Sequence, residues 1–317
     1  MIFGFITDSQ IRGVNPINRS GDFLGDLIKK FKEFIEVGLK MNVDAFIHGG
    51  DFFDSPLVSL TIADTFVDMM EATGKDWYIV RGNHDEIGHN PNLSGESMLD
   101  HIFRRSKIVR EMGARALRDE SAFVQGFDYY HGIEQDIREK GLMCCMPHLN
   151  CPKIAVVHGM ITPFSLHPKI MHVRTDEIKT DFNLVLCAHF HQEFGIHKEG
   201  RTTYVGIGAF ARMSIAEWDV KRVPNMLIVN THLPMIKIIP LETARPWEDI
   251  FDLSAIKEQE KFENRIDDFI HSLESTKVQG LNLRGVIEDI AKRENIDRKV
   301  IDEVIRRISE NEAEVCI

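Results

Sequence analysis

The chain of 317 residues is longer than one domain usually requires, so we expect one large domain followed by one or two small modules. Hydrophobic residues at 43% and charged residues at 27% exclude a disordered or fibrous protein. The formal net charge of −11 excludes a protein that coats nucleic acid by bulk attraction, so any contact with DNA must be local.

Hydropathy and cysteine usage both favour a cytoplasmic protein. No apolar stretch approaches the roughly 18 residues of a membrane span, and residues 1–7 carry no basic leader, so we expect no membrane association. The five cysteines are irregularly spaced and do not form a disulfide framework in a chain of this length. A zinc site is the weaker alternative, and it would use Cys144, Cys145, Cys151 and Cys187.

One segment is locally basic. Residues 104–118 contain six basic residues and one acidic residue, enough to neutralise a few phosphates of a nucleic acid. The alternative interpretation of the same segment is a solvated helix face.

The predicted elements alternate between strands and helices. Apolar runs at residues 2–7 and 43–48 predict buried parallel strands, and residues 25–41 between them carry apolar side chains at helical spacing. This order predicts a right-handed strand–helix–strand unit. A further helix is predicted over 61–72, with strands over 77–80, 154–157, 184–187 and 204–207.

The sequence changes in character after residue 212. Strands predicted over 226–229 and 235–239 suggest a small β-rich module, and the residues beyond it are charged and helical in pattern. We therefore expect a large domain over 1–212, a capping module over 213–252 and a C-terminal helical segment over 253–317. The helices of that segment are predicted over 254–275, 283–293 and 298–309.

Five of the predicted strands are followed by clusters of polar residues. In chain order these are T-D-S-Q (7–10), G-G-D-F-F-D (49–54), R-G-N-H-D-E (81–86), V-V-H-G-M (156–160) and A-H-F-H-Q (188–192). The carboxyl ends of strands are where open α/β sheets bind their ligands. Carboxylate and amide oxygens mixed with imidazoles suit Mn²⁺, Fe²⁺ or Zn²⁺, and two such ions about 3.5–4 Å apart can promote displacement at phosphorus.

In order and spacing these motifs resemble the signature of the calcineurin-like metallophosphoesterases. The resemblance implies an α/β fold, a β-sandwich flanked by helices, and two divalent metal ions. Carried over by position, it makes Asp51 the bridging ligand. The remaining ligands are then Asp8 and His191 on one metal, and Asn83, His158 and His189 on the other.

The same resemblance gives roles to residues beside the ligands. His84 is expected to act on the phosphate, and we group Asp85 with it in the catalytic site, where Asp85 and Asp54 are expected to orient other groups. His48 is expected to pack inside a strand. Four histidines match no motif position: His89, His167, His172 and His232.

Sequences around the motifs point to one branch of the superfamily. G-G-D-F-F-D-S-P, H-V-R-T-D-E-I and A-R-P-W-E-D-I-F resemble SbcD-type DNA repair exonucleases over residues 1–252, and the compact cap is similar to phage and prophage forms. This implies a Mn²⁺-dependent 3′–5′ DNA exonuclease with endonuclease activity that forms a homodimer. It also implies that the C-terminal helices bind an SbcC-like coiled-coil ATPase.

Two departures from that branch leave alternatives open. The first motif ends in Gln10 where the branch has histidine, and Gly206 to Phe210 lack its usual Gly-Ser pair. A glutamine amide oxygen can still ligate a metal, and a nucleotide-pyrophosphatase branch also carries Asp-x-Gln. The competing hypotheses are a small-molecule phosphodiesterase or pyrophosphatase and, outside enzymes, a degenerate scaffold.

Overall fold

The computed structural model describes residues 1–17, 19–87, 95–113, 116–233, 235–252, 254, 261, 300 and 301. The chain divides into two compact units, residues 1–251 and 252–317. Of the predicted C-terminal helices only four positions are described, so these predictions, like that for His89, lie outside the described residues.

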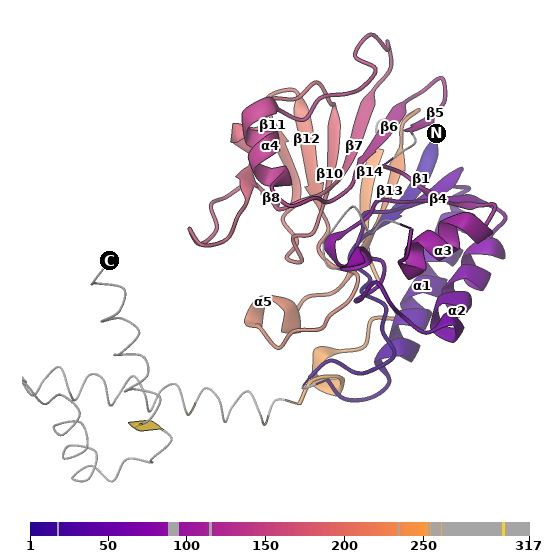
Figure 1. Cartoon of the computed structure of the whole chain (residues 1–317), viewed down its shortest axis with the longest axis vertical. Helices are drawn as coiled ribbons and strands as arrows, with labels where there is room; N and C mark the ends of the chain where they lie inside the picture. The colour runs from indigo at the N-terminus through magenta and orange to yellow at the C-terminus, as the bar shows by residue number, and fades with distance from the viewer. Residues whose placement is uncertain are drawn as a thin grey trace, which may run out of the picture. The chain divides into compact units, whose positions relative to one another are not determined.

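The first unit contains two six-stranded mixed sheets and one two-stranded sheet (Figure 1). The first sheet has the order β14-β13-β1-β2-β3-β4. Strands β1 to β4 are parallel to one another, whereas β13 is antiparallel to its two neighbours, β1 and β14. Its strands are β1 (Ile2–Ile6), β2 (Ala45–His48), β3 (Asp76–Ile79), β4 (Val109–Glu111), β13 (Asn225–Asn230) and β14 (Met235–Pro240).

The second sheet has the order β11-β12-β10-β7-β6-β5, with parallel strands at its centre and antiparallel strands at both edges. Its strands are β5 (Ala116–Arg118), β6 (Phe123–Phe127), β7 (Lys153–His158), β10 (Leu184–Ala188), β11 (Gly195–Glu199) and β12 (Thr202–Gly206). The small sheet pairs β8 (Ile161–Thr162) with β9 (Val173–Arg174).

The inner faces of the two large sheets share one hydrophobic core. Phe5 and Ile47 from the first sheet belong to the same buried cluster as Val156 and Leu186 from the second. Alternate residues of the same strands point outward, so that both faces of the central strands are buried. This double burial explains why the strands appear in the sequence as continuous apolar runs.

Helices cover the outer faces of the sandwich (Figure 1). Helices α1 (Phe23–Lys40), α2 (Leu60–Glu71) and α3 (Met98–Arg105) pack on the first sheet, where Phe46 and Trp77 stack with ring centroids 4.4 Å apart. Helix α4 (Ile133–Lys140) packs on the second sheet, and α5 (Glu217–Val220) is a single turn. The predicted fold class, a helix-flanked β-sandwich of mixed α/β composition, is confirmed.

Two expectations differ from the structure. Strands β13 and β14, which we assigned to a separate capping module, extend the first sheet because β13 pairs with β1, and residues 213–251 belong to the first compact unit. Their apolar side chains alternate between the two cores, which joins them to the sandwich. The basic segment 104–118 is not one helix, because it forms the end of α3 and strands β4 and β5.

No described helix is both long and apolar enough to cross a membrane.

Candidate active site

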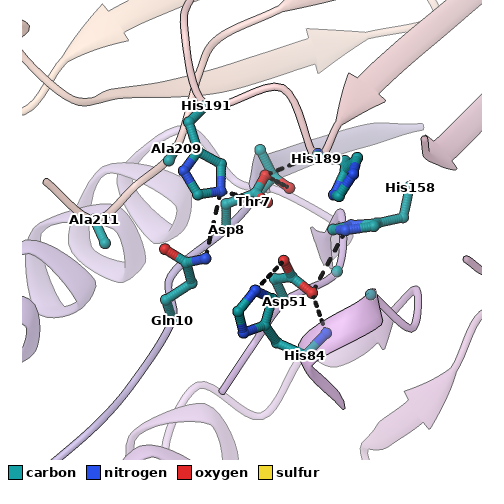
Figure 2. A network of polar contacts seen from close by, with 12 residues as sticks. Thr7, Asp8, Gln10, Asp51, His84, His158, His189, His191, Ala209 and Ala211 are labelled. Carbon is teal, nitrogen blue, oxygen red and sulfur yellow. Dashed lines mark hydrogen bonds and ion pairs between the residues drawn. The ribbon is translucent and has the colours of Figure 1, made fainter. Parts of the chain in front are cut away.

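The five polar motifs follow β1, β2, β3, β7 and β10 and meet at one edge of the sandwich (Figure 2). The first three strands belong to the first sheet and the other two belong to the second. The site therefore lies where the carboxyl ends of strands from both sheets converge.

Asp51 occupies the centre of the site and contributes to two groups of potential metal ligands. One group is Asp51, His158 and His189, and the other is Asp8, Asp51 and His191; in each, the ligand atoms lie within 4.8 Å of one another. His158 Nε2 lies 3.5 Å from Asp51 Oδ1, and His191 Nε2 lies 3.5 Å from Asp8 Oδ1. A carboxylate common to both groups is the arrangement needed to hold two cations side by side.

Several buried polar atoms at this centre have no hydrogen-bond partner among the residues that the structure describes. They are Asp8 Oδ1, Gln10 Oε1, Asp51 Oδ2 and His189 Nδ1. A buried polar atom without a partner destabilises a folded protein, so atoms that gather in this way indicate a ligand that satisfies them. Bound cations would satisfy all four.

Neighbouring groups orient the candidate ligands. His158 Nδ1 lies 2.9 Å from the Gly49 carbonyl oxygen, to which it donates, so Nε2 is the ring nitrogen that faces Asp51 and that a metal ion would bind once its proton is displaced. Asn83 Oδ1 lies 3.3 Å from the same Nε2. On the other side, Thr7 Oγ1 donates to Asp8 Oδ2 over 2.6 Å. Such supporting contacts fix the orientation of metal ligands.

The backbone is strained at four site residues. Asp8, Gln10, Asp51 and His189 have φ angles of 52°, 42°, 50° and 76°, in the left-handed region that residues other than glycine rarely adopt. Among the described residues only Asn42 shares this property. Strain of this kind persists where the surrounding structure enforces it and is concentrated at functional sites.

One glycine is required by close packing around Asp51. A Cβ atom on Gly82 would lie 2.0 Å from Asp51 Oδ1 and 2.3 Å from the Asp51 backbone nitrogen. The G-N-H-D motif can therefore approach the central carboxylate only because it begins with glycine.

Burial and mutual charge shift the pKa values of the cluster. Burial lowers the pKa of His158, but the carboxylate of Asp51 and then that of Asp8 raise it to about 9. Burial and the charge of His158 lower the pKa of His189 to about 4. Burial raises the pKa of Asp8, yet His191 and His158 hold it well below its ordinary value. A cation that binds here must displace the proton of His158, so metal affinity is expected to increase with pH.

His84 lies at the mouth of the site. Its backbone N–H donates to Asp51 Oδ1 over 2.9 Å, and its ring Nδ1 lies 2.9 Å from the Asp54 carbonyl oxygen, to which it donates. The other ring nitrogen, Nε2, lies 4.0 Å from Asp51 Oδ2, and the side chain is 38% exposed. His84 is thus placed beside the candidate ligands and open to a substrate.

Asp85 does not reach the pocket, although we grouped it with His84 as catalytic. The side chain is fully buried and accepts hydrogen bonds from the backbone N–H groups of Phe52, Phe53 and Gly82. These bonds join the loop after β2, which carries Asp51, to the loop that carries Asn83. Asp85 therefore positions these two loops, which is the orienting role that we expected for it.

Two other sequence expectations concern residues away from the ligands. His48 is fully buried, and its Nε2 lies 2.9 Å from Ser9 Oγ, as expected for a packing role. No cysteine belongs to a metal-ligand group within the described part of the chain, so the structure gives the alternative zinc site no support.

The structure adds residues to the site to which we had assigned no role. The Tyr129 ring centroid lies 5.5 Å from that of His189. A cavity of about 430 Å³ opens onto Asp51 and His84, and its remaining wall is largely apolar. The wall is formed by Met160, Leu166, Ile170, Phe190 and Trp218. Met160 and Phe190 belong to two of the motifs, whereas Leu166, Ile170 and Trp218 come from segments without a local pattern, and only the tertiary structure brings them together.

A model of the calcineurin-like phosphoesterases matches residues 1–193. The chain belongs to the calcineurin-like phosphoesterase family. Members bind two divalent metal ions, and the residues present fit such a pair, because the unpartnered atoms and the two ligand groups coincide. One ion would be held by Asp8, Asp51 and His191, next to Gln10, and the other by Asp51, Asn83, His158 and His189. The chain is therefore a metal-dependent phosphoesterase.

Individual relatives of this calcineurin-like phosphoesterase are distant. The DNA double-strand break repair protein Mre11 of Methanococcus maripaludis is 22% identical over 198 residues, which are 61% of this chain and 53% of that protein. The chain thus spans about half the length of this relative. A protein from Thermus thermophilus (12% identity) and a dimetal phosphatase from Danio rerio (11%) have similar structures, each with a TM-score of 0.46 over 76% of this chain and 99% of theirs.

Proposed function

We propose that this phosphoesterase is a Mn²⁺-dependent DNA nuclease, a 3′–5′ exonuclease with endonuclease activity. The observation that carries the proposal is the carboxylate of Asp51 shared by two ligand groups, a site suited to phosphodiester hydrolysis. The motif context shared with SbcD-type nucleases and the similarity to Mre11 favour DNA as the substrate.

Exposed basic side chains near the site support contact with a nucleic acid backbone. Arg104, Lys107 and Arg110 line a cavity of about 980 Å³ that also includes Tyr129, the neighbour of His189. The same lining contains the acidic residues Glu86, Asp100, Glu111 and Asp128. Arg110 pairs with Asp76, whereas no acidic partner of Arg104 or Lys107 is found within the described ranges. These two exposed cations would attract phosphates despite the acidic net charge of the chain.

When bound, the two ions would supply an activated water and positive charge that offsets the charge of the phosphate. The chain positions the remaining chemistry. The carbonyl oxygen of Asp54 holds Nδ1 of His84, which leaves Nε2 facing the pocket. A protonated Nε2 would donate to the phosphate and transfer its proton to the leaving oxygen as the P–O bond breaks.

The test is cleavage of labelled single-stranded and duplex DNA with Mn²⁺ or Mg²⁺. We expect Mn²⁺-stimulated cleavage that His84→Ala abolishes while metal binding, measured by calorimetry, is retained. Loss of both metals in His84→Ala would contradict its assignment.

Gln10 favours a second candidate, a small-molecule phosphodiesterase or pyrophosphatase, because that branch also carries Asp-x-Gln. The same preparation is therefore assayed against ADP-ribose and a generic phosphodiester. Turnover of ADP-ribose without DNA cleavage would select this alternative.

We further propose that the nuclease works as a homodimer with an SbcC-like coiled-coil ATPase that binds residues 253–317. Support comes from the sequence, in which residues 283–293 and 298–308 carry short apolar stripes, and a pair of helices this short would bury little surface by itself. Truncation after Thr276 is expected to abolish co-purification with the ATPase. Full recovery of the complex after truncation would contradict the proposal.

A further inference from the structure

The catalytic cavity has two chemically different walls. One wall carries Asp51, His84, His189 and His191, and the other carries large apolar side chains, among them Trp218 and Phe190. Trp218 is 42% exposed, although an indole is among the side chains that gain most from burial. A phosphate would need only the polar wall, so the apolar wall indicates a second part of the substrate.

Trp218 lies on a segment that is firmly anchored. The next residue, Asp219, is buried, accepts the backbone N–H groups of Met213 and Ser214 over 3.0 and 2.9 Å, and pairs with Arg222 over 2.9 Å. Such a network holds the turn of α5 in one conformation. The exposed indole of Trp218 is therefore carried by a segment that hydrogen bonds and an ion pair hold in place.

The same network ties this segment to the candidate metal ligands. Arg222 donates to the carbonyl oxygens of Ala209 and Ala211 over 2.5 and 2.7 Å. The backbone N–H groups of these two alanines donate in turn to the carbonyl oxygens of His191 and Asp8, respectively. Figure 2 shows both alanines beside the site. The indole is thus held in a fixed relation to the metal-binding end of the cavity.

The rest of the apolar wall comes from the loop between β8 and β9 and from the loop after β10. In the sequence, Phe190 lies between His189 and His191. Its ring centroid lies 6.0 Å from that of Phe164. Ile170 is 44% exposed and lines the cavity with Leu166. A flat, largely apolar group that enters beside the phosphate would contact these side chains and Trp218.

We propose that Trp218 is a stacking platform for the nucleobase of the nucleotide whose phosphate occupies the metal site, an inference that rests on the proposed nuclease function. Bases stack on aromatic side chains with little dependence on sequence, because every base has a π-face. A cavity of about 430 Å³ lies near the small end of ligand pockets, about 300–1,000 Å³, and admits one nucleotide and not a duplex. The substrate is therefore an unpaired nucleotide, and a base in a duplex must leave its stack before cleavage.

Binding can be tested without catalysis. Tryptophan fluorescence is followed in Mg²⁺ during titration with thymidine 5′-monophosphate or with 2-deoxyribose 5-phosphate, which lacks the base. We expect quenching by the nucleotide alone and its loss in Trp218→Phe, while Trp77, which is fully buried, and Trp247, which is not part of the cavity wall, give a constant background. Equal signals from the two ligands, or quenching that persists in the variant, would overturn the proposal.

Kinetics provide the second test. Single-stranded DNA is compared with the same oligonucleotide that carries an abasic residue at the position to be cleaved. Wild-type protein is expected to prefer the intact strand roughly 10-fold in kcat/KM, in line with stacking energies at aromatic residues. Trp218→Ala should bring this ratio close to one, Trp218→Phe should retain most of it, and Trp247→Ala, remote from the cavity wall, should leave it unchanged.

The outcomes separate the two proposals. A variant that slows both oligonucleotides equally, with an unchanged ratio, would show that Trp218 supports the fold only. Failure of the wild-type protein to cleave either strand would contradict the nuclease proposal, and the fluorescence titration would still decide whether Trp218 binds a base.

Discussion

Arg222 stabilises the fold and also supports the backbone beside one of the two metal sites. Its replacement by methionine allows the two contributions to be measured separately. The guanidinium is almost completely buried, pairs with buried Asp219 and donates to two backbone carbonyl oxygens. Removal of one partner of a buried pair costs about 3–5 kcal/mol. The two carbonyl groups would add to this cost and the apolar methionine would reduce it, so we expect Arg222→Met to destabilise the protein by about 4 kcal/mol.

The loss of the Arg222 guanidinium should also weaken the binding of the two ions to different extents. Ala209 and Ala211, which Arg222 holds, contact the backbone of His191 and Asp8 and not that of His158. Binding at the Asp8–His191 side should therefore weaken more than binding at the His158–His189 side. Urea unfolding in EDTA measures stability, and calorimetric titration with Mn²⁺ measures the two sites. An equal loss at both sites, or a stability change below about 1 kcal/mol, would refute this reasoning.

Three further predictions concern single residues. Asp85→Ala should lower the free energy of unfolding by about 2 kcal/mol, because three backbone N–H groups lose their acceptor. His84→Ala should lower the turnover rate without this loss of stability. Urea unfolding and rate measurements on both variants check the two expectations. Gln10→His should tighten Mn²⁺ binding beside Asp8, since imidazole is the stronger donor, and calorimetry would show no change if Gln10 is not a ligand. Burial raises the pKa of Asp128 to about 6, so ionisation of its carboxyl destabilises the folded state as pH rises from about 4 to 6. Since the side chain is partly exposed, we expect a moderate effect: Asp128→Asn should be about 1–2 kcal/mol more stable than wild type at pH 7.5 and no more stable at pH 4. Urea unfolding at the two pH values measures this difference. An equal gain at both pH values would contradict the raised pKa of Asp128.

The central strands of the fold could be predicted because both of their faces are buried. Residues 2–7, 43–48 and 184–187 are predominantly apolar, and each contains or overlaps a strand of the structure. Strands β4 and β5, by contrast, have only three residues each and lie at sheet edges. The division of the strands between two sheets could not be predicted, because an apolar run looks the same in either sheet.

The candidate ligands were accessible to sequence reasoning because each lies at the carboxyl end of a strand or within four residues after it. Asp8 and Asp51 follow β1 and β2 closely, so the strand register brings them together once the sheet forms. An orienting role for Asp85 was expected, but the groups that it holds were not accessible, because they are backbone donors from two loops. Trp218 was missed for a similar reason, since one tryptophan on a short turn has no pattern that connects it to a cavity.

The central claim is that Asp51 holds two divalent ions together, and anomalous X-ray scattering from crystals soaked in Mn²⁺ tests it most directly. We expect two peaks, one beside Asp8 and His191 and one beside His158 and His189, with Asp51 in contact with both, and neither peak in Asp51→Ala. A single ion, or two ions of which only one contacts Asp51, would contradict the account.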